Sequence, residues 1–531
     1  MKKQTRVQGT WVWIVVIGQA LIVFLITAAL FITTFLYGRL VTVNIMEARN
    51  FITAREMAQK SNWLLPTMNG EPRIAKPPLP TWVTALFMIK AGTDADLMVN
   101  RIPSGIAALL LAFFAALLIK RIIGDRKTVV LSLLVLTTSY LFMLSARKNC
   151  WDIYSIAFMT GAVWAITAAF HREKGRPIFF VLASFFMACA FYSKGPVPFW
   201  VMLVPFLASF VIVYGGQPLR KNRNGLIWAF LICVALSALW PLFVYFNIPH
   251  KAVSVASGES HGWFTRHTEP AWYYLLHFPE IVGIWIFHLL YGLSVLFKKD
   301  RTSEEKFFAI WFLLTIVVIS VVPEKKVRYL LPAVVPAAMV VASTLRRLEK
   351  NNDPAGKLVT GAFTLVAGCL FLVAAAGIIY FSQGKVWPLM GVPLLTGISV
   401  LLFFLYIKKQ INRLPFIVVI GLCLCLVFLP PVVSSQFEQN QIAPFMHLRN
   451  VSAYKGKDFY SMGRIPPEVI WASGRSIRPL ENLSLADIMA GGTPFVLIKE
   501  GALDKQPTGI LLLKTVKTTK RTFFIYCFNA N

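Results

Sequence analysis

The sequence is poor in charge and poorer still in acidic residues. Only 15% of its 531 residues are charged, 57% are hydrophobic, and 24 acidic residues stand against 53 basic ones. A soluble chain would carry about a quarter charged residues, so the composition excludes an ordinary soluble globular protein. No soluble basic module with interleaved aromatic residues occurs, which argues against a nucleic-acid partner.

Cysteine is also scarce. The seven cysteines are scattered along the chain, and most lie within apolar segments, where a thiol acts as a small hydrophobic group. Their spacing matches neither a disulfide framework nor a zinc knuckle. A small secreted fold held by disulfides and a zinc-finger protein are therefore both excluded.

Apolar runs long enough to cross a bilayer are abundant. They predict an all-α polytopic membrane protein with about thirteen spans. The first follows "MKKQTR" and lacks a small-residue cleavage site, so we interpret it as an uncleaved span. The predicted spans cover roughly 11–37, 102–119, 128–146, 153–170, 177–192, 197–214, 225–247, 280–297, 307–322, 329–344, 358–382, 386–407 and 414–433.

The distribution of lysine and arginine predicts the orientation. If the N-terminus is cytoplasmic, every predicted inner loop is short and basic, as the positive-inside tendency requires. An odd number of spans then places the C-terminus on the outer side. The tendency selects against basic residues in outer loops, so those that remain there suggest an anionic ligand, with contact to lipid headgroups as the alternative.

Two domains are predicted. Residues 1–433 form the membrane domain, and residues 434–531 form a small outer α/β domain with alternating short strand and helix patterns. Within the membrane domain, the first outer loop, 38–101, contains an amphipathic helix, "MEARNFITAREMAQK", and a second short apolar piece, "PTWVTALFMIKAG". A proline- and glycine-rich loop connects them.

Four clusters on the predicted outer face carry reactive or charged side chains. An acidic residue at the end of an apolar span is costly and is a functional candidate by default, although Asp152 could equally cap span four. Two prolines after Lys76 fix the backbone and keep that lysine out of helical geometry. The clusters are Glu47 with Arg49; Lys76 in "AKPPLPTW"; Asp152 in "RKNCWDIYSIAF"; and Glu259, His261, Arg266 and His267 together with "PEKKVRYLLP" at 323–332.

In this order, the motifs resemble those of the lipid-linked sugar transferases of the aminoarabinose transferase and protein O-mannosyltransferase superfamily. The resemblance covers about 11–433 and is strongest over 44–82, "NIMEARNFITAREM" through "RIAKPPLPTW". It is supported by Asp152, "SKGPVP" at 193–198 and "KKVRYLLP" at 325–332. It implies the C-type glycosyltransferase fold, and the outward C-terminal domain resembles the aminoarabinose transferase branch.

The resemblance implies a multi-pass enzyme of the bacterial inner membrane, with a cytoplasmic N-terminus and a periplasmic C-terminal domain. It would transfer a sugar from undecaprenyl phosphate to lipid A, another envelope glycan or a protein, with inversion at the sugar carbon. It assigns Glu47 and Asp152 as catalytic carboxylates, and Lys76, Arg266 and Tyr329 to the donor phosphate. Further candidates are Arg49, Lys194, Lys325, Lys326 and Arg328.

One position departs from the family pattern. Met46 stands where the family usually has an aspartate before Glu47, so either Glu47 or Asp152, or neither, could take the expected acid role. If the acceptor is a phosphate group, little base help is needed because phosphate is already ionised.

No cofactor is predicted apart from an optional divalent cation. Glu259, His261 and His267 are suitable ligand types. Their spacing matches no closed zinc site, and polar loop histidines without a metal are the alternative.

Two other function classes compete with the transferase. A transporter or flippase of an anionic polyprenyl lipid explains the apolar bulk and the basic outer residues, but it needs no structured first loop with a fixed lysine. Transporters also often contain two related halves, and the sequence reveals none. A structural scaffold leaves the charges at the span ends unexplained.

Overall fold

The computed structural model describes residues 43–171, 176–265, 267–294, 296, 301–350, 353–382, 386–430, 432, 443–454, 457–480, 488, 495–500, 511–517 and 522–527. These divide into two compact units. Unit 1 holds Ala75–Pro77 and Ser104–Pro430, and unit 2 holds the described parts of Tyr37–Ile74, Pro78–Pro103 and Pro431–Asn531. The predicted first span, 11–37, lies outside the described residues.

Long apolar helices dominate the chain, as the composition predicts. Among the described residues, eight helices are long and apolar enough to cross a membrane, and the bent pair α5 (Arg126–Thr138) and α6 (Tyr140–Arg147) makes a ninth if it counts as one span. The mostly helical, multi-span fold is therefore confirmed. The eight are α4 (Leu97–Ile122), α7 (Trp151–Phe170), α8 (Arg176–Lys194), α11 (Arg223–Asn247), η4 with α17 (Val327–Lys350), α18 (Pro354–Phe381), α19 with α20 (Val386–Ile407) and η5 with α21 (Ile411–Phe428).

The predicted count of thirteen is not reached in the described residues. Three predicted spans are shorter, broken or more polar helices, because prolines, a glycine at positive φ and charged residues interrupt them. Gly283, for example, has a φ of 61° and separates α14 from η3. The three are 197–214, now η2 (Phe199–Leu203) with α9 (Val204–Tyr214); 280–297, now α14 (Pro279–Val282), η3 (Gly283–Trp285) and α15 (Ile286–Ser294); and 307–322, now α16 (Ser303–Val321), whose first turn is acidic.

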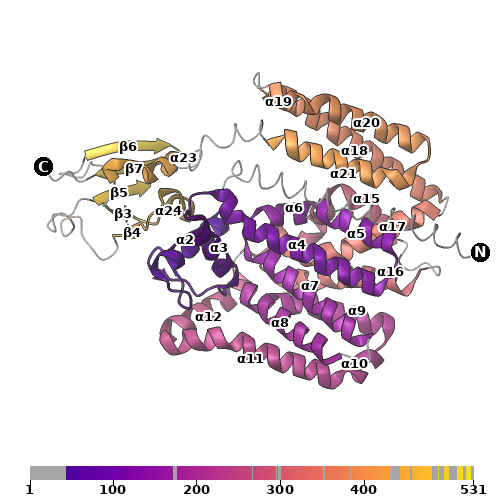
Figure 1. Ribbon diagram of the computed structural model, residues 1–531, viewed down its shortest axis with the longest axis horizontal. Coiled ribbons are helices and arrows are strands. Elements are labelled where there is room, and N and C mark those ends of the chain that lie inside the picture. The colour runs from indigo at the N-terminus through magenta and orange to yellow at the C-terminus, as the bar shows by residue number, and fades with distance from the viewer. Residues whose placement is uncertain are drawn as a thin grey trace, which may run out of the picture. The chain divides into compact units, whose positions relative to one another are not determined.

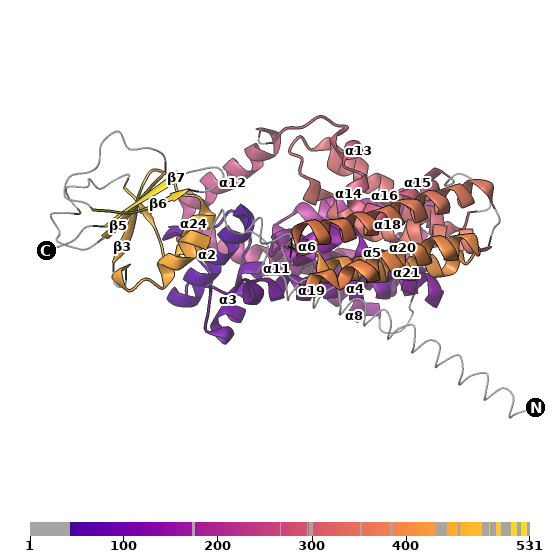
Figure 2. The same ribbon diagram turned by 90° about the horizontal axis from the view of Figure 1, so that it is seen from above.

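Helices α18, α20 and α21 lie side by side in both views (Figures 1 and 2). Glycines let them approach closely. At Gly421 of α21, an added Cβ would lie 2.4 Å from the ring of Phe371 on α18. At Gly397 of α20, an added Cβ would meet nothing within 4 Å.

Gly421→Ala is therefore expected to destabilise the protein by about 1–3 kcal/mol, because the methyl group overpacks the α18–α21 contact. Gly397→Ala is the matched control, since alanine in an open helical position is neutral or stabilising by about 0.5–1 kcal/mol. Thermal unfolding of the detergent-solubilised protein, followed by tryptophan fluorescence, measures both. Equal melting temperatures for the two variants would contradict this packing.

Unit 2 contains a small five-stranded sheet with the order β4-β3-β5-β7-β6. Strand β3 (Asp458–Met462) pairs in parallel with β4 (Arg478–Pro479) and β5 (Phe495–Glu500), whereas β7 (Thr522–Cys527) pairs antiparallel with β5 and β6 (Leu511–Lys517). Helix α24 (Pro467–Ser473) follows β3. The strands predicted in "KDFYSMG" and "PFVLIKEGAL" and the helix in "PPEVIWASG" are confirmed, and "LSLADIMAGG" lies almost wholly outside the described residues.

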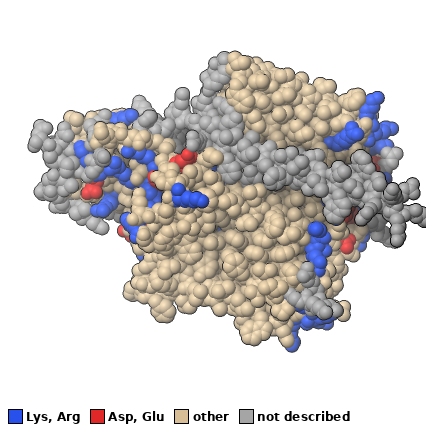
Figure 3. Space-filling model, in the orientation of Figure 1, with Lys and Arg blue, Asp and Glu red and all other residues tan. Residues whose placement is uncertain are grey.

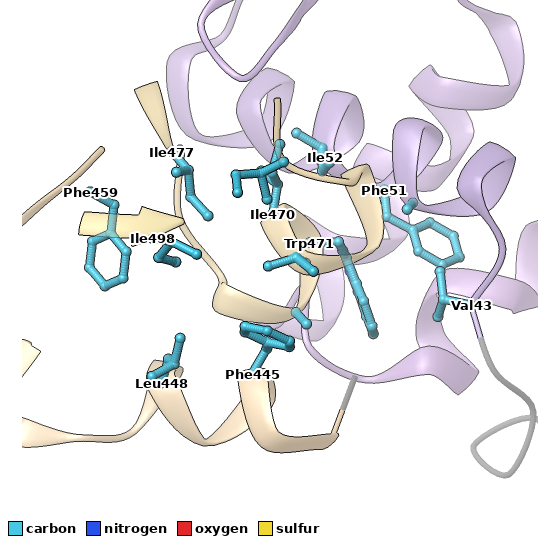
Figure 4. Close-up of a cluster of buried hydrophobic side chains, with 14 of the residues drawn as sticks. Val43, Phe51, Ile52, Phe445, Leu448, Phe459, Ile470, Trp471, Ile477 and Ile498 are labelled. Carbon is cyan, nitrogen blue, oxygen red and sulfur yellow. The ribbon is translucent and has the colours of Figure 1, made fainter. Parts of the chain in front are cut away.

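The helices of the predicted first outer loop belong to the same compact unit. Helices α2 (Ile45–Lys60) and α3 (Leu79–Ala91) flank a two-stranded hairpin, β1 (Thr67–Met68) and β2 (Glu71–Pro72). Phe51 and Ile52 of α2 share one hydrophobic cluster with Ile470 and Trp471 of α24 (Figure 4). This grouping differs from the expected one, in which the amphipathic helix of the first outer loop belongs to the membrane domain 1–433.

Polar contacts reinforce this shared core. Buried Arg55 of α2 donates to the carbonyl of Arg475 at 3.1 Å, and Glu56 accepts from Asn69 N and Gly70 N in the β1–β2 turn. Burial lowers the pKa of Arg55, although Asp94, 3.6 Å away, opposes the shift. Helix α2 thus joins the hairpin and the tail into one folding unit.

Candidate active site

A buried carboxylate with two cationic partners lies at the ends of three helices of unit 1. Asp152, in the first turn of α7, forms an ion pair with Lys194 in the last turn of α8, and Arg328 Nε of η4 (Val327–Ala333) lies 3.8 Å from Asp152 Oδ2. Asp152 is only 7% exposed. The helix dipole stabilises a negative charge near a helix N-terminus and a positive charge near a helix C-terminus.

Two roles were considered for Asp152, a helix cap and a functional carboxylate, and the structure distinguishes between them. The N-cap of α7 is Cys150, and no side chain donates or accepts a capping hydrogen bond there. Asp152 therefore does not cap the helix. Its carboxylate faces Lys194 and Arg328 instead, which makes it part of a charged cluster.

Tyr329 extends this cluster. Its hydroxyl donates to Glu324 Oε1 at 3.1 Å, and its ring carries the ammonium of Lys194 at 4.5 Å from the centroid. Lys326 Nζ lies 2.5 Å from Glu324 Oε1. Four residues of the motif "PEKKVRY" therefore belong to the charged cluster around Asp152. They are Glu324, Lys326, Arg328 and Tyr329.

Glu324 was not among the predicted site residues. Burial alone would raise its pKa, but the hydrogen bond and charge of Lys326, the hydroxyl of Tyr329 and the charge of Lys76 together hold that pKa below its ordinary value. The signal was visible in the sequence, as a lone acid that opens a run of three cations and a tyrosine.

Lys76 belongs to unit 1 with this cluster. The tripeptide Ala75–Pro77 packs with that unit, and the positive charge of Lys76 acts on Asp152, Lys194 and Glu324. Its side chain is half-buried. Pro78 serves as the N-cap of α3, so the proline pair leads from the segment that carries Lys76 into that helix.

A second segment is tied to the same loop. Lys325 N donates to the carbonyl of His267 at 3.2 Å, and Thr268 forms a β-bridge with Glu324. The side chains of Lys325 and Lys326 have different partners. The ammonium of Lys325 donates to the carbonyl of Val322 at 2.7 Å, whereas that of Lys326 pairs with Glu324. The predicted residues His267 and Lys325 therefore lie on the two strands of one short backbone pairing, and Lys326 follows directly after it.

Glu47 and Arg49 belong to unit 2. The Glu47 carboxylate is fully buried and accepts from Arg101 Nε at 2.8 Å and Arg101 Nη2 at 3.1 Å. It also closes a capping box with Asn44, the N-cap of α2. Arg101 was not predicted, but Asn44 three residues before a glutamate is the sequence pattern of such a cap.

Some predicted site residues lie outside what the structure describes. These are Arg266 and the side chains of Glu259 and His261, which belong to the helix α12 (Pro249–Thr265) and the residue after it. Among the residues that are described, no group of three or more metal-binding side chains occurs. The metal prediction therefore stays a prediction.

The chain is similar to membrane sugar transferases over two regions. Residues 75–245 match the family model of dolichyl-phosphate-mannose-protein mannosyltransferases, and residues 259–391 match that of the Alg9-like mannosyltransferase family. The first region contains Lys76, Asp152 and Lys194, and the second contains Arg328 and Tyr329.

Curated relatives include undecaprenyl phosphate-alpha-4-amino-4-deoxy-L-arabinose arabinosyl transferases. The protein from Shewanella sediminis is 25% identical over 360 residues, which cover 64% of this chain and 62% of that relative. One from Pseudomonas fluorescens is 25% identical over 357 residues, covering 64% and 61%. The chain thus spans about three-fifths of the length of these relatives.

Solved structures match over nearly the whole chain. The crystal structure of ArnT from Cupriavidus metallidurans bound to undecaprenyl phosphate superposes with a TM-score of 0.75 and 16% identity, covering 96% of this chain and 98% of that one. Its apo form gives a TM-score of 0.72 at 14% identity. At this identity the match shows a common fold. The two family matches, the curated relatives and this common fold agree in one respect: the chain is similar to the superfamily of C-type membrane glycosyltransferases that includes the ArnT-like and protein mannosyltransferase-like families.

Proposed function

We propose that this protein takes a sugar from an undecaprenyl phosphate donor and transfers it to an acceptor on the outer face of the bacterial inner membrane. The charged cluster of unit 1 carries this proposal. Four cations (Lys76, Lys194, Lys326 and Arg328) accompany only two carboxylates, Asp152 and Glu324. An excess of fixed positive charge at the ends of apolar helices suits a phosphate that is anchored in the bilayer by its lipid chain.

The chemistry assigns roles to these cations. The bond between the sugar carbon and the donor phosphate oxygen breaks, the acceptor oxygen bonds to that carbon, and undecaprenyl phosphate leaves with the electron pair. Fixed cations stabilise the negative charge that develops on the leaving phosphate. We assign this task to Lys76 and Arg328. Tyr329, whose hydroxyl donates to Glu324, and Arg266 remain predicted helpers. Direct displacement would invert the sugar carbon.

Asp152 is best suited to hold the cations in place. Both of its oxygens already face a cation, so neither is well placed to take a proton from an acceptor hydroxyl. The buried Glu47 carboxylate is similarly engaged by Arg101. An acceptor whose attacking oxygen is already ionised, such as a phosphate of lipid A, fits a site of this kind because it needs no base.

Purified protein tests the proposal directly. It is mixed with an undecaprenyl phosphate that carries a radiolabelled sugar and with an envelope lipid extract, and the label in the acceptor fraction is measured. Labelled acceptor together with free undecaprenyl phosphate is expected. Movement of the labelled lipid across sealed vesicles without any transfer of sugar would instead favour the flippase.

Asp152→Asn is expected to lower kcat by about 100- to 1,000-fold and to raise the donor KM, because Lys194 and Arg328 lose the group that positions them. Glu349→Gln is the matched control. That carboxylate also pairs with two cations, Lys127 and Arg346, at the far end of α17 (Val334–Lys350). The Glu349→Gln variant should change neither kcat nor the donor KM. Equal losses in both variants, with lowered melting temperatures, would show that Asp152 only stabilises the fold.

A further inference from the structure

A second basic site lies in unit 1 at the other end of α8. A cavity of about 580 Å³ opens between the first turns of α8 and α11, next to the short helix α10 (Gln217–Lys221). Lys194, in the cluster around Asp152, ends the same helix. Nineteen helical residues span about 28 Å, so the cavity is separate from the candidate active site.

The rim of the cavity is strongly basic. Arg176, Arg220, Lys221 and Arg223 line it, and no acidic residue is among its lining residues. The N-termini of α8 and α11 both face it and add partial positive charge. In Figure 3, basic side chains gather at the lower right, where Figure 1 places α10, beside a broad uncharged face.

Below this rim the walls are apolar. Phe180 and Val181 of α8 and Trp228 and Ile232 of α11 lie about one to two and a half turns along from Arg176 and Arg223. Val181 is 50% exposed and Trp228 is 64% exposed. Gly225 lets α11 approach Phe180, since a Cβ there would lie 2.2 Å from the phenyl ring. A cationic rim over an apolar wall matches a phosphate head joined to acyl chains.

Asn222 provides an independent sign of a missing ligand. It is only 5% exposed and lines the cavity. Its Nδ2 donates to the carbonyl of Pro218 at 2.8 Å, which fixes the amide orientation, while its Oδ1 accepts no hydrogen bond. A buried acceptor without a donor is costly. The Asn222 Oδ1 exposes less than 1 Å², so a headgroup hydroxyl would satisfy it by displacing the side chains that now cover it.

We propose that this cavity binds an anionic phospholipid whose headgroup carries a hydroxyl, such as phosphatidylglycerol. The phosphate would lie among the four cations, the glycerol hydroxyl would donate to Asn222, and an acyl chain would follow the apolar wall of α8 and α11. Because the predicted topology puts residues 220–223 on the cytoplasmic side, the lipid would come from the inner leaflet. The proposal does not depend on the sugar-transfer chemistry.

Native mass spectrometry of the full-length protein, titrated in detergent with phosphatidylglycerol or phosphatidylcholine, tests this site. The combined variant Arg220→Gln, Lys221→Gln and Arg223→Gln is expected to bind phosphatidylglycerol more weakly by about 10- to 100-fold. The control combines Lys408→Gln, Lys409→Gln and Arg413→Gln. These three exposed cations are predicted to lie on the same side of the membrane but do not line the cavity, and their loss should leave binding nearly unchanged.

Trp228→Ala keeps every charge and removes part of the apolar wall. This variant is expected to weaken phosphatidylglycerol binding by about tenfold. If the triple variant fails to fold, Trp228→Ala alone tests whether the cavity binds the lipid. Equal losses in the two triple variants would overturn the proposal in favour of general charge attraction. Displacement of the lipid by millimolar inorganic phosphate would also overturn it, since the site would then recognise a free anion. Sugar transfer should persist in all these variants.

Discussion

Lys76→Ala is expected to lower the rate of sugar transfer by about 100- to 1,000-fold, because the variant loses a fixed charge that acts on the leaving phosphate. Lys76 lies in a three-residue segment that packs with unit 1, while the residues on either side belong to unit 2. Two following prolines restrict that segment. The ammonium therefore cannot be replaced easily by a neighbouring lysine or arginine.

Lys76→Arg sharpens this prediction. It keeps the charge but changes its shape from a compact ammonium to a planar fork, so partial activity is expected. The rate is measured with labelled donor at saturating concentration. The control is Lys90→Ala, an exposed lysine in the last turn of α3, which should retain full activity. An unchanged kcat with a raised donor KM in Lys76→Ala would limit this lysine to substrate binding.

Arg101→Ala should have the largest effect on stability, about 3–5 kcal/mol, because the buried Glu47 carboxylate loses the charge and the two hydrogen bonds of Arg101. Arg101 and Glu47 are 3% and 0% exposed, and two hydrogen bonds join them. The unfolding midpoint in denaturant measures the loss. Adding Glu47→Gln to Arg101→Ala should recover part of the stability, since no uncompensated charge is then buried.

The same pair of residues tests the predicted catalytic role of Glu47. Glu47→Gln alone keeps the shape of the side chain and removes its charge. If the variant remains folded and transfers sugar at the normal rate, Glu47 acts through the fold of α2. Loss of transfer without a loss of stability would support the role that the family resemblance assigns to this carboxylate.

Local patterns in the sequence predicted much of this protein correctly. Apolar run length identified the membrane-spanning class, and the strand and helix patterns of 458–473 and 495–500 were confirmed. These features depend on residues close together in the chain, so periodicity and composition are sufficient to reveal them. Span 280–297 failed for a local reason too, since Gly283 breaks the helix.

The contacts of individual charges needed the tertiary structure. Asp152, Lys194 and Arg328 come from three separate segments, and no spacing rule predicts that one carboxylate meets those two cations. Arg101 was missed for the same reason, because it is defined by its partner Glu47 rather than by a motif.

The lengths of the apolar runs, the net charge and the two prolines that restrict the backbone after Lys76 were therefore properties of the sequence by itself. The tertiary structure decided that α2 packs against α24 about four hundred residues later, and that four basic residues surround one cavity at the start of α8. The physical reason is that burial and ion pairing depend on distance in space, which the chain sets only when its helices have packed.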